Sequence, residues 1–259
     1  MKIVTVINAK GGCGKSTIAM NLAAAFAHHG TSVLLSDMDP QAQVSEWLGA
    51  SDGLTWENTV VAALLGHVPL EEIIHPTSHE NLSFLASAFA LEEFGRDIVH
   101  QEAYYEGYAR LLAQLPEDRF DYLIVDAPNQ ISPIMENTIY PADLFIVPFE
   151  STKAVKSYAN FYSLLLQIRP EEDFQILHVL NNLPRAGLRK RVIERMREEE
   201  IPIASAEIRN CGWLAQVDEH GGSILKYRPK SKGAQDIRTL HDEVLTLFGA
   251  DTSKKAVNA

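Results

Sequence analysis

Cysteine is scarce in this chain: two residues, Cys13 and Cys211, occur among 259. Two thiols cannot build a disulfide scaffold, and one chain with two thiols cannot supply a four-cysteine zinc or iron–sulfur site. Such low cysteine use is typical of proteins that work in a reducing compartment. The nine histidines show no metal-ligand spacing, so the sequence indicates no metal site built from them.

Long apolar runs are also missing, because none approaches the roughly 20 residues that a membrane-spanning helix needs. The first residues, MKIVTVINAKGG, read as a strand that enters a glycine loop, which is not a secretory signal pattern. Residues 251–259 are polar and lack the basic amphipathic pattern of a membrane-surface helix. We therefore expect no membrane partner, one folded domain over residues 1–250 and a disordered tail over 251–259.

Basic residues are fewer than acidic ones, 23 against 34, which gives a net charge of −11. This balance argues mildly against a nucleic-acid partner, but the charge is uneven. Residues 185–232, the basic region, hold 11 Lys and Arg against 7 Asp and Glu, a net charge of +4. The rest of the chain carries 12 basic and 27 acidic residues, a net charge of −15. A basic region in an acidic protein hints at contact with a polyanion.

The chain does contain a regular alternation of apolar strands and amphipathic helices. The predicted strands are Lys2–Ile7, Ser32–Ser36, Leu82–Leu85, Tyr122–Asp126, Leu144–Pro148, Ile176–Asn181 and Ile203–Ile208. The predicted helices are one that follows the glycine loop and stops at Gly30, then Ala103–Gln114, Lys153–Gln167, Leu188–Glu199 and Ala234–Leu247. Strands such as VLLSD and YLIVD are almost continuously apolar, which suits parallel strands covered on both faces. The pattern predicts an α/β fold with a doubly wound, mostly parallel sheet flanked by helices.

Residues 10–17 read Lys-Gly-Gly-Cys-Gly-Lys-Ser-Thr, between a predicted strand and a predicted helix. This is the context of a phosphate-binding loop, in which glycines let several backbone N–H groups point at phosphate oxygens. Lys15 can reach the β- and γ-phosphates of a nucleotide, and the Ser16 hydroxyl can ligate Mg²⁺. The predicted nucleotide contacts of the loop are Lys10, Gly11, Gly12, Cys13, Gly14, Lys15, Ser16 and Thr17.

Carboxylates follow two of the predicted strands. Asp37 and Asp39 stand in the motif DMDPQAQ, where strand alternation puts them on the same side. Asp126 ends the strand YLIVD, which is the Walker B arrangement and predicts an Mg²⁺ contact through water. Carboxylates beside a phosphate loop can hold Mg²⁺ water and orient an attacking water. An Asp-Pro pair is also a common turn, so the first motif has a plain structural alternative.

The loop KGGCGKST resembles the deviant Walker A motif of the ParA/MinD family of ATPases, and DMDPQAQ resembles the DxDPQ motif of that family. The resemblance implies that Lys10 reaches across a dimer interface to the partner's nucleotide. It implies that Asp37 contacts the Mg²⁺ shell and that Asp39 positions the attacking water. The expected catalytic residues are therefore Lys10, Lys15 and Asp39, and the expected metal ligands are Ser16, Asp37 and Asp126.

Two positions near these motifs depart from the general patterns and one agrees. Ala9 takes the place of the first glycine of the general phosphate-loop pattern. Asn129 stands where the family usually has a second proline after the Walker B strand, whereas Asn137 keeps the family's asparagine. The sequence therefore does not predict the conformation of the loop after Asp126.

The carboxyl-terminal third carries weaker signals. In this family an amide side chain near the end of this strand, 176–181, usually contacts the adenine base. Here that amide would be Asn181 or Asn182, and a plain turn at these residues is an equally good interpretation. Residues 208–210 and 227–234 resemble two loops near which the nucleoid-binding branch contacts DNA backbone, although a solvated surface is the alternative. The candidate DNA contacts are Arg185, Arg189, Lys190, Arg191, Arg209, Lys226, Arg228, Lys230, Lys232 and Arg238.

The resemblance covers nearly the whole chain and is weakest over residues 45–115. It implies a slow P-loop ATPase that uses ATP and Mg²⁺, forms an ATP-dependent homodimer and binds double-stranded DNA non-specifically. A partner adaptor protein would stimulate hydrolysis, and the cargo would be a plasmid, a chromosome, or a protein assembly such as carboxysomes or chemotaxis clusters. The expected location is cytoplasmic and nucleoid-associated. The alternatives are a MinD-like cell-division regulator, which needs a membrane anchor, and an ATP-dependent synthetase, which needs a second substrate pocket.

Overall fold

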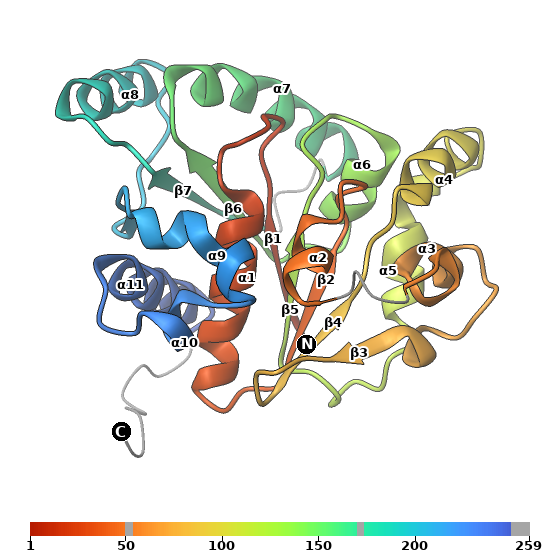
Figure 1. Cartoon of the computed structure of the whole chain (residues 1–259). Coiled ribbons are helices and arrows are strands. Elements are labelled where there is room, and N and C mark those ends of the chain that lie inside the picture. Colours follow the sequence, from red (N-terminus) through yellow and green to blue (C-terminus); the bar gives the residue numbers. More distant parts are fainter. Residues whose placement is uncertain (50–53, 170–173, 250–259) are drawn as a thin grey trace.

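The computed structural model describes residues 1–49, 54–169 and 174–249, so the predicted tail over 251–259 lies outside the described residues. Eight strands form one sheet with helices on both faces (Figure 1). The strands are β1 (Lys2–Val6), β2 (Val33–Asp37), β3 (Ile74–Pro76), β4 (Leu82–Leu85), β5 (Tyr122–Asp126), β6 (Leu144–Phe149), β7 (Gln175–Asn181) and β8 (Glu207–Ile208). The α-helices are α1 (Lys15–His28), α2 (Gln43–Trp47), α3 (Val60–Leu64), α4 (Ala90–Ile98), α5 (Gly107–Leu112), α6 (Pro133–Ile139), α7 (Thr152–Ile168), α8 (Ala186–Glu198), α9 (Val217–His220), α10 (Ile224–Tyr227) and α11 (Lys232–Leu247). Short 3₁₀ turns are η1 (Trp56–Asn58), η2 (Leu70–Ile73), η3 (Tyr104–Glu106) and η4 (Gly212–Gln216).

The strand order in the sheet is β3-β4-β2-β5-β1-β6-β7-β8. The pairs from β4 to β8 are parallel, and the short edge strand β3 runs antiparallel to β4. This order confirms the predicted doubly wound, mostly parallel sheet. It also brings the carboxyl ends of the parallel strands to one edge, which is where such folds bind their ligands.

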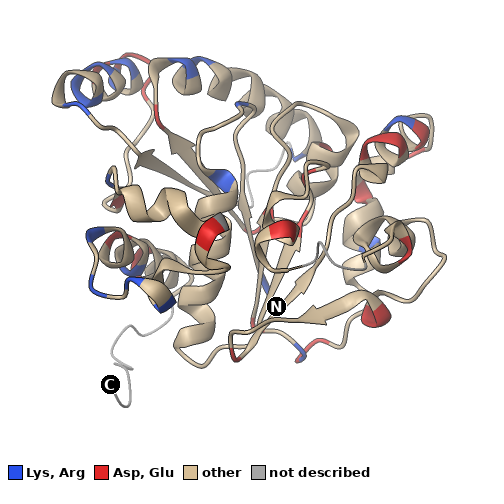
Figure 2. Ribbon diagram, in the orientation of Figure 1, with Lys and Arg blue, Asp and Glu red and all other residues tan. Residues whose placement is uncertain are grey.

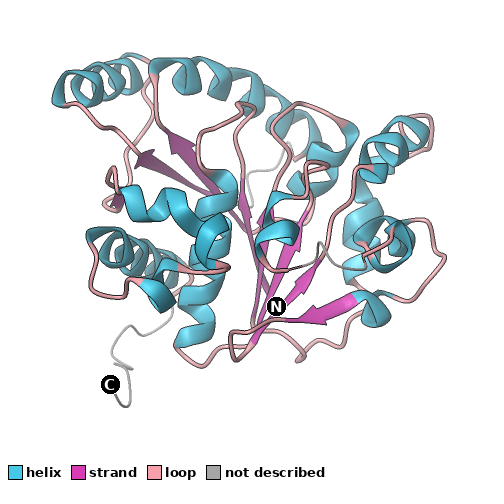
Figure 3. Ribbon diagram, viewed as in Figure 1, coloured by secondary structure: helices cyan, strands magenta, loops and turns pink. Residues whose placement is uncertain are grey.

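Helices cover both faces of the sheet (Figure 3), because neighbouring strand residues point to opposite sides. Val33 and Leu35 of β2 lie in an apolar cluster with side chains of α1 and α11. Leu34, between them in sequence, lies in a second cluster with side chains of α3, α4 and α5. A third cluster joins β6 and β7 to α6, α7 and α8. Burial on both faces explains why these strands are almost continuously apolar.

The predicted strand Ile203–Ile208 is wrong over most of its length, because β8 contains two residues, Glu207 and Ile208. The backbone N–H groups of Ser205 and Ala206 donate to the carboxylate of Glu243 on α11, at 2.9 and 2.5 Å. A helix side chain therefore takes the hydrogen bonds that a strand would have given to the sheet.

The predicted helix Ala103–Gln114 is shorter and broken. Ala103 has a left-handed backbone, with φ 49°, so η3 and then α5 replace one continuous helix. The side-chain oxygen of Asn137 accepts a hydrogen bond from the backbone N–H of Tyr108 at 2.9 Å, which ties α5 to α6. Several short elements were not predicted at all, namely β3, α2, α3, α4, α6, α9 and α10. Of these, α6 has a readable start, because Ser132 caps it and Pro133 is its first residue.

A buried histidine in the sheet should make stability depend on pH. The ring Nε2 of His178 on β7 lies 2.8 Å from the hydroxyl oxygen of Tyr158. Burial lowers the pKa of His178 from 6.5 to about 4. As the pH falls, the histidine of the unfolded chain is protonated before the buried histidine of the folded chain. The free energy of unfolding should therefore fall by a few kcal/mol as the pH drops from about 7 to about 4. In urea melts, His178→Gln should show a weaker loss between about pH 7 and pH 4 than the natural chain. Equal losses would contradict this assignment.

Candidate functional site

A cavity of about 590 Å³ opens at the carboxyl edge of the parallel strands. Its size lies within the range of small-molecule binding sites. The lining residues come from the phosphate-binding loop and the start of α1, from the segments after β2 and β5, from the ends of β7 and β8, and from η4 and its neighbours on either side. They include Gly12, Gly14, Lys15, Ser16, Thr17, Asp39, Gln41, Asn129, Asn181, Asn182, Arg209, Cys211, Leu214, Ala215 and Val217. The structure thus brings the predicted loop, Asp39 and both candidate asparagines to one cavity.

The loop between β1 and α1 has the backbone that phosphate binding requires. Gly14 has φ +89°, and a Cβ added there would lie 2.3 Å from the side-chain nitrogen of Asn181. That nitrogen donates a hydrogen bond to the backbone oxygen of Cys13 at 2.6 Å. Gly14 is therefore needed both for its positive φ and for the close approach of β7. The Cys13 side chain is buried, and burial raises the pKa of its thiol, so this cysteine packs rather than reacts.

Lys15 begins α1 beneath this loop and is 5% exposed. Its ammonium donates to the backbone oxygen of Lys10 at 3.3 Å. The ammonium thus points into the turn of the loop, where phosphate oxygens are held in proteins with this motif. An anion that binds beside this buried ammonium would stabilise it, because a hydrogen bond between two charged groups is stronger than the long one to a backbone oxygen.

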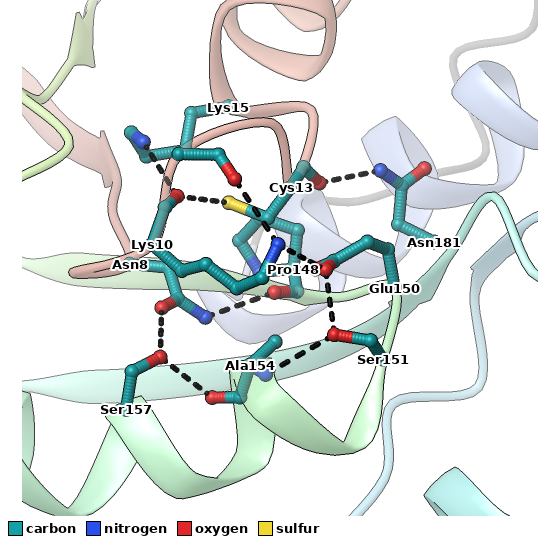
Figure 4. Close-up of polar contacts among 11 residues, drawn as sticks. Asn8, Lys10, Cys13, Lys15, Pro148, Glu150, Ser151, Ala154, Ser157 and Asn181 are labelled. Atoms are coloured by element: carbon teal, nitrogen blue, oxygen red, sulfur yellow. Dashed lines mark hydrogen bonds and ion pairs between the residues drawn. The ribbon is translucent and has the colours of Figure 1, made fainter.

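Lys10 lies at the rim of the loop and folds back onto its own chain (Figure 4). Its ammonium lies 2.5 Å from Oε1 of Glu150, just beyond β6, and donates to the backbone oxygen of Gly11 at 3.1 Å. Glu150 Oε1 also accepts a hydrogen bond from the hydroxyl of Ser151 at 2.7 Å. Glu150 is not among the site residues predicted from the sequence. It could have been found from its place, because it follows an apolar strand that ends at the same edge as the loop.

Asp37 and Asp126 end neighbouring strands and are paired in the register of β2 and β5. Both are fully buried. Asp37 accepts hydrogen bonds from the backbone and hydroxyl of Ser45, each at 2.8 Å, while burial raises its pKa to about 6. Burial and the neighbouring Asp37 raise the pKa of Asp126 well above its usual value, and the nearby Ser16 and Lys15 offset only part of this rise. Neither oxygen of Asp126 has a hydrogen-bond partner within the described part of the chain.

The unpartnered oxygens of Asp126 fit a cation, because buried carboxylate oxygens without donors are costly unless something pairs with them. No group of three or more His, Cys, Asp or Glu residues that could hold a metal occurs among the described residues. Mg²⁺ does not need such a cage, since it is usually bound by one or two carboxylates, waters and substrate phosphates. Ser16 and Asp126, with water, are therefore suitable ligands beside a bound phosphate.

Asp39 differs from the other two carboxylates because it borders the cavity and is 8% exposed. Its Oδ1 accepts a hydrogen bond from the backbone N–H of Gln41 at 3.0 Å, and its backbone oxygen accepts one from Ser87 at 2.7 Å. These contacts fix the backbone of Asp39 and one of its carboxylate oxygens at the cavity wall. Such a group can hold a water molecule near a bound phosphate.

The two candidate asparagines have different surroundings. Asn181 is buried and donates its amide to the phosphate loop, as described above. Asn182 is exposed, has φ +50°, and accepts a hydrogen bond from the side chain of Asn210 at 2.5 Å. The geometry therefore favours Asn182 as a contact for a base and gives Asn181 a supporting role.

Two further asparagines, Asn129 and Asn137, also have different surroundings. Asn129 borders the cavity, and its side-chain nitrogen would lie 3.9 Å from a Cβ on Gly11. Asn137 is buried and donates to the backbone oxygen of Pro133 at 2.8 Å. Asn137 thus stabilises the start of α6, while Asn129 replaces a proline with a side chain that can donate and accept hydrogen bonds.

Lys and Arg gather over α8 and around α10 and the start of α11, as Figure 2 shows. Nine of the ten candidate DNA contacts are exposed, and Arg238 is half-buried. Two of them form forked ion pairs: Arg189 with Glu207, and Arg209 with Asp236, which is 5% exposed. Arg209 therefore ties β8 to α11 and has less freedom to meet a phosphate than the three lysines of residues 226–232.

The chain is similar to known proteins over most of its length. A family model described as an AAA domain matches residues 1–176. The chain is 30% identical to the chromosome-partitioning ATPase Soj of Thermus thermophilus, over 93% of this chain and 94% of that one. It is 27% identical to the chromosome partitioning protein ParA of Myxococcus xanthus, over 94% and 88% of the two chains.

A solved structure of Cyanothece McdA in complex with ATP has the same fold, with a TM-score of 0.84 at 20% identity over 100% of this chain and 99% of that one. No helix in residues 1–49, 54–169 or 174–249 has the length and apolar character to cross a membrane. From its phosphate loop, its sheet order and these relatives, the chain belongs to the ParA/MinD family of P-loop ATPases.

Proposed function

We propose that this protein is an ATP- and Mg²⁺-dependent ATPase that dimerises around ATP, binds duplex DNA non-specifically and segregates or positions a cargo. The observation that carries the proposal is the loop with two lysines, Lys10 at the rim and Lys15 buried, at a cavity that Asp39 borders. The relatives named for chromosome partitioning support the same use. A partner protein would stimulate hydrolysis, and the chain would work in the cytoplasm on the nucleoid.

Different residues of the cavity bind the phosphates, orient the attacking water and contact the base. The backbone N–H groups of the loop and the Lys15 ammonium hold the β- and γ-phosphates and stabilise charge that develops on them. Asp39 orients the attacking water, and Asn182 with Asn210 contacts the base. Mg²⁺, held through Ser16 and Asp126, would supply charge neutralisation at the phosphate oxygens. Asp37, engaged by Ser45, positions the loop that carries Asp39.

Two features support a dimer. Lys10 must exchange Glu150 for a phosphate, and a phosphate in a partner's site offers more negative charge than one carboxylate. Phe89 and Ile131, which are 64% and 48% exposed, lie in loops that follow β4 and β5 at the edge where the cavity opens. Large exposed apolar side chains at such an edge suit burial against a second copy.

Binding to a random-sequence DNA duplex tests the proposal. We expect binding with ATP that is about tenfold or more tighter than with ADP or without nucleotide, because only a dimer presents two basic surfaces at once. Affinity should fall steeply between low and moderate salt, as expected for contacts to phosphates. Fluorescence anisotropy of a labelled duplex, measured in each nucleotide state, gives both quantities.

Lys10→Ala is the matched variant for this experiment. It should still bind ATP, remain a monomer by light scattering and bind DNA no better with ATP than with ADP. If Lys10→Ala dimerises with ATP as the natural chain does, the cross-interface role of Lys10 is wrong. If the natural chain binds no DNA in any nucleotide state, the DNA-tracking part of the proposal fails and a protein scaffold becomes the alternative.

A further inference from the structure

A second cavity, of about 400 Å³, lies between α3, α4 and α5, and we name it the α3–α5 groove. It shares no lining residue with the candidate nucleotide site. The large apolar side chains that line it are Leu64, Leu65, Phe94, Ile98 and Leu111. Leu65 is 46% exposed, so the apolar surface of the groove continues onto the outside of the molecule.

Two polar side chains of the α3–α5 groove already have partners. The hydroxyl of Tyr104 donates to the carboxylate of Glu136 on α6. The guanidinium of Arg110 pairs with Glu106 at 3.1 Å. A site for a small molecule orients its ligand with a few convergent polar groups, and these two side chains are not free to do so. The groove therefore suits a longer apolar segment better than a small polar ligand.

The charge of the surrounding segment is strongly negative. Residues 54–119 hold 11 Asp and Glu against 3 Lys and Arg, a net charge of −8. The three arginines all lie in ion pairs within the segment: Arg96 with Glu92, Arg110 with Glu106, and Arg119 with Glu71. The other eight acidic side chains are exposed and form no ion pair with any residue that the structure describes. Such a surface complements a basic partner.

This acidic surface and the basic region lie at opposite ends of the sheet. Figure 1 shows α3, α4 and α5 on the right and α8, α10 and α11 on the left. Figure 2 shows the corresponding division of charge, with Lys and Arg over α8 and α10 and Asp and Glu near α3 and α4. Two macromolecules of opposite charge can therefore bind at the two ends without competing. The acidic end also falls within residues 45–115, where the resemblance to the family is weakest, so its surface is particular to this chain.

We propose that the α3–α5 groove binds an amphipathic helix of another protein, with apolar side chains in the groove and Lys or Arg toward the surrounding acids. This inference rests on the proposed function, because the other protein would be the cargo adaptor, and it names the surface and the kind of segment that meet. An amphipathic helix in an apolar groove is a recurring mode of peptide recognition. Because the groove and the nucleotide cavity share no lining residue, this docking does not require ATP.

Binding of synthetic peptides to the full chain is the first test. The probe is a labelled peptide of about 18 residues, five helical turns, with leucines on one face and lysines beside them. One control peptide has Glu in place of every Lys, and another has the same composition with the leucines spread around the helix. Fluorescence anisotropy should show the basic amphipathic peptide bound about tenfold or more tighter than either control. Its affinity should agree within about twofold without nucleotide, with ADP and with a non-hydrolysable ATP analogue.

Substitutions of exposed residues locate the peptide. Leu65→Ser should weaken binding about threefold or more, because it removes apolar surface from the groove. Glu93 and Glu102 are exposed and adjoin the lining residues Phe94 and Gln101. Glu93→Lys and Glu102→Lys should each weaken binding about threefold at low salt and less at high salt.

Matched control variants lie at the other end of the sheet. Leu247 on α11 is 37% exposed, so Leu247→Ser is the control for Leu65→Ser. Glu200, which is exposed just beyond α8, gives Glu200→Lys as the control for the charge reversals. Both should bind the peptide as the natural chain does. A thermal melt of each variant shows that the fold is kept, and if Leu65→Ser is unfolded the two glutamate variants decide.

Photo-crosslinking in cells that produce this protein tests the natural partner. A photo-reactive amino acid at position 65 should link to a segment of another protein in which Lys or Arg flank apolar residues spaced three and four apart. The same amino acid at position 247 should not link to that segment. No product at position 65, or a linked segment without this pattern, overturns the proposal.

The outcomes separate this inference from the proposed function. If the basic peptide binds no tighter than its acidic control, or if the Leu65 and glutamate variants bind it unchanged, the groove is not the docking site and the proposed function stands. If the natural chain binds no DNA in any nucleotide state but binds the peptide at the groove, the DNA part of the proposed function fails and the docking site stands. A change of about tenfold in peptide affinity between ADP and the ATP analogue would overturn docking that is independent of the nucleotide.

Discussion

Lys15→Ala should lower the affinity for ATP by about 100-fold or more, because it removes the buried cation that faces the phosphates. Lys15 is 5% exposed and has one long hydrogen bond, at 3.3 Å, to the backbone oxygen of Lys10. The folded chain without ligand therefore loses little when this ammonium is removed. Isothermal titration with ATP and Mg²⁺ measures the affinity, and a thermal melt without nucleotide shows that the fold is kept.

Lys2→Ala is the matched control, since Lys2 begins the same strand β1 at the opposite edge of the sheet. It removes an equal charge and should leave ATP affinity unchanged. Tight ATP binding by Lys15→Ala would overturn the assignment of the phosphate site. A melt that shows unfolding of Lys15→Ala would instead assign the lysine a structural role, which the length of its hydrogen bond to Lys10, 3.3 Å, argues against.

Asp39→Ala should bind ATP but turn it over about 100-fold more slowly, in the range that loss of a positioned proton acceptor produces. The carboxylate borders the cavity and is held by the N–H of Gln41, whereas Asp37 and Asp126 are fully buried behind it. The ATP-bound dimer should therefore persist. Phosphate release gives the turnover, and light scattering after a chase with ADP gives the lifetime of the dimer.

Asp39→Asn separates charge from shape in this experiment. The amide oxygen can still accept the hydrogen bond from Gln41, so the turn is kept while the negative charge is lost. We expect Asp39→Asn to turn over ATP almost as slowly as Asp39→Ala. Asp97→Ala, an exposed acid on α4, should turn over ATP at the natural rate. Unchanged turnover in Asp39→Ala would remove this residue from the mechanism.

Much of the fold follows from local sequence patterns. The strands Leu82–Leu85 and Tyr122–Asp126 have the predicted bounds, because short, mostly apolar runs between polar turns leave little choice of start and end. The predictions that failed depended on side chains from distant segments. Glu243 takes the backbone bonds of residues 205 and 206, and no local pattern in 203–208 reveals that partner.

The candidate site was predictable to the extent that it is one continuous motif. Residues 10–17 form a loop whose glycines, lysines and hydroxyl follow one another, so spacing alone predicts phosphate binding. The roles of Asn181 and Asn182 were not separable, because neighbours in a strand differ only in what the fold places beside each. One meets the phosphate loop and the other meets Asn210.

The sequence by itself determined the α/β class, the phosphate loop and the aspartates at the strand ends, because these depend on short-range periodicity and spacing. Only the tertiary structure decided that Glu150 pairs with Lys10, that both oxygens of Asp126 lack hydrogen-bond partners among the described residues, and that Arg228 lies over the Trp213 ring. The ion pair of Lys10 with Glu150 joins two segments that the crossover connections of the sheet bring together. The chemistry of all three features depends on distance and burial, and neither quantity is written in the order of the residues.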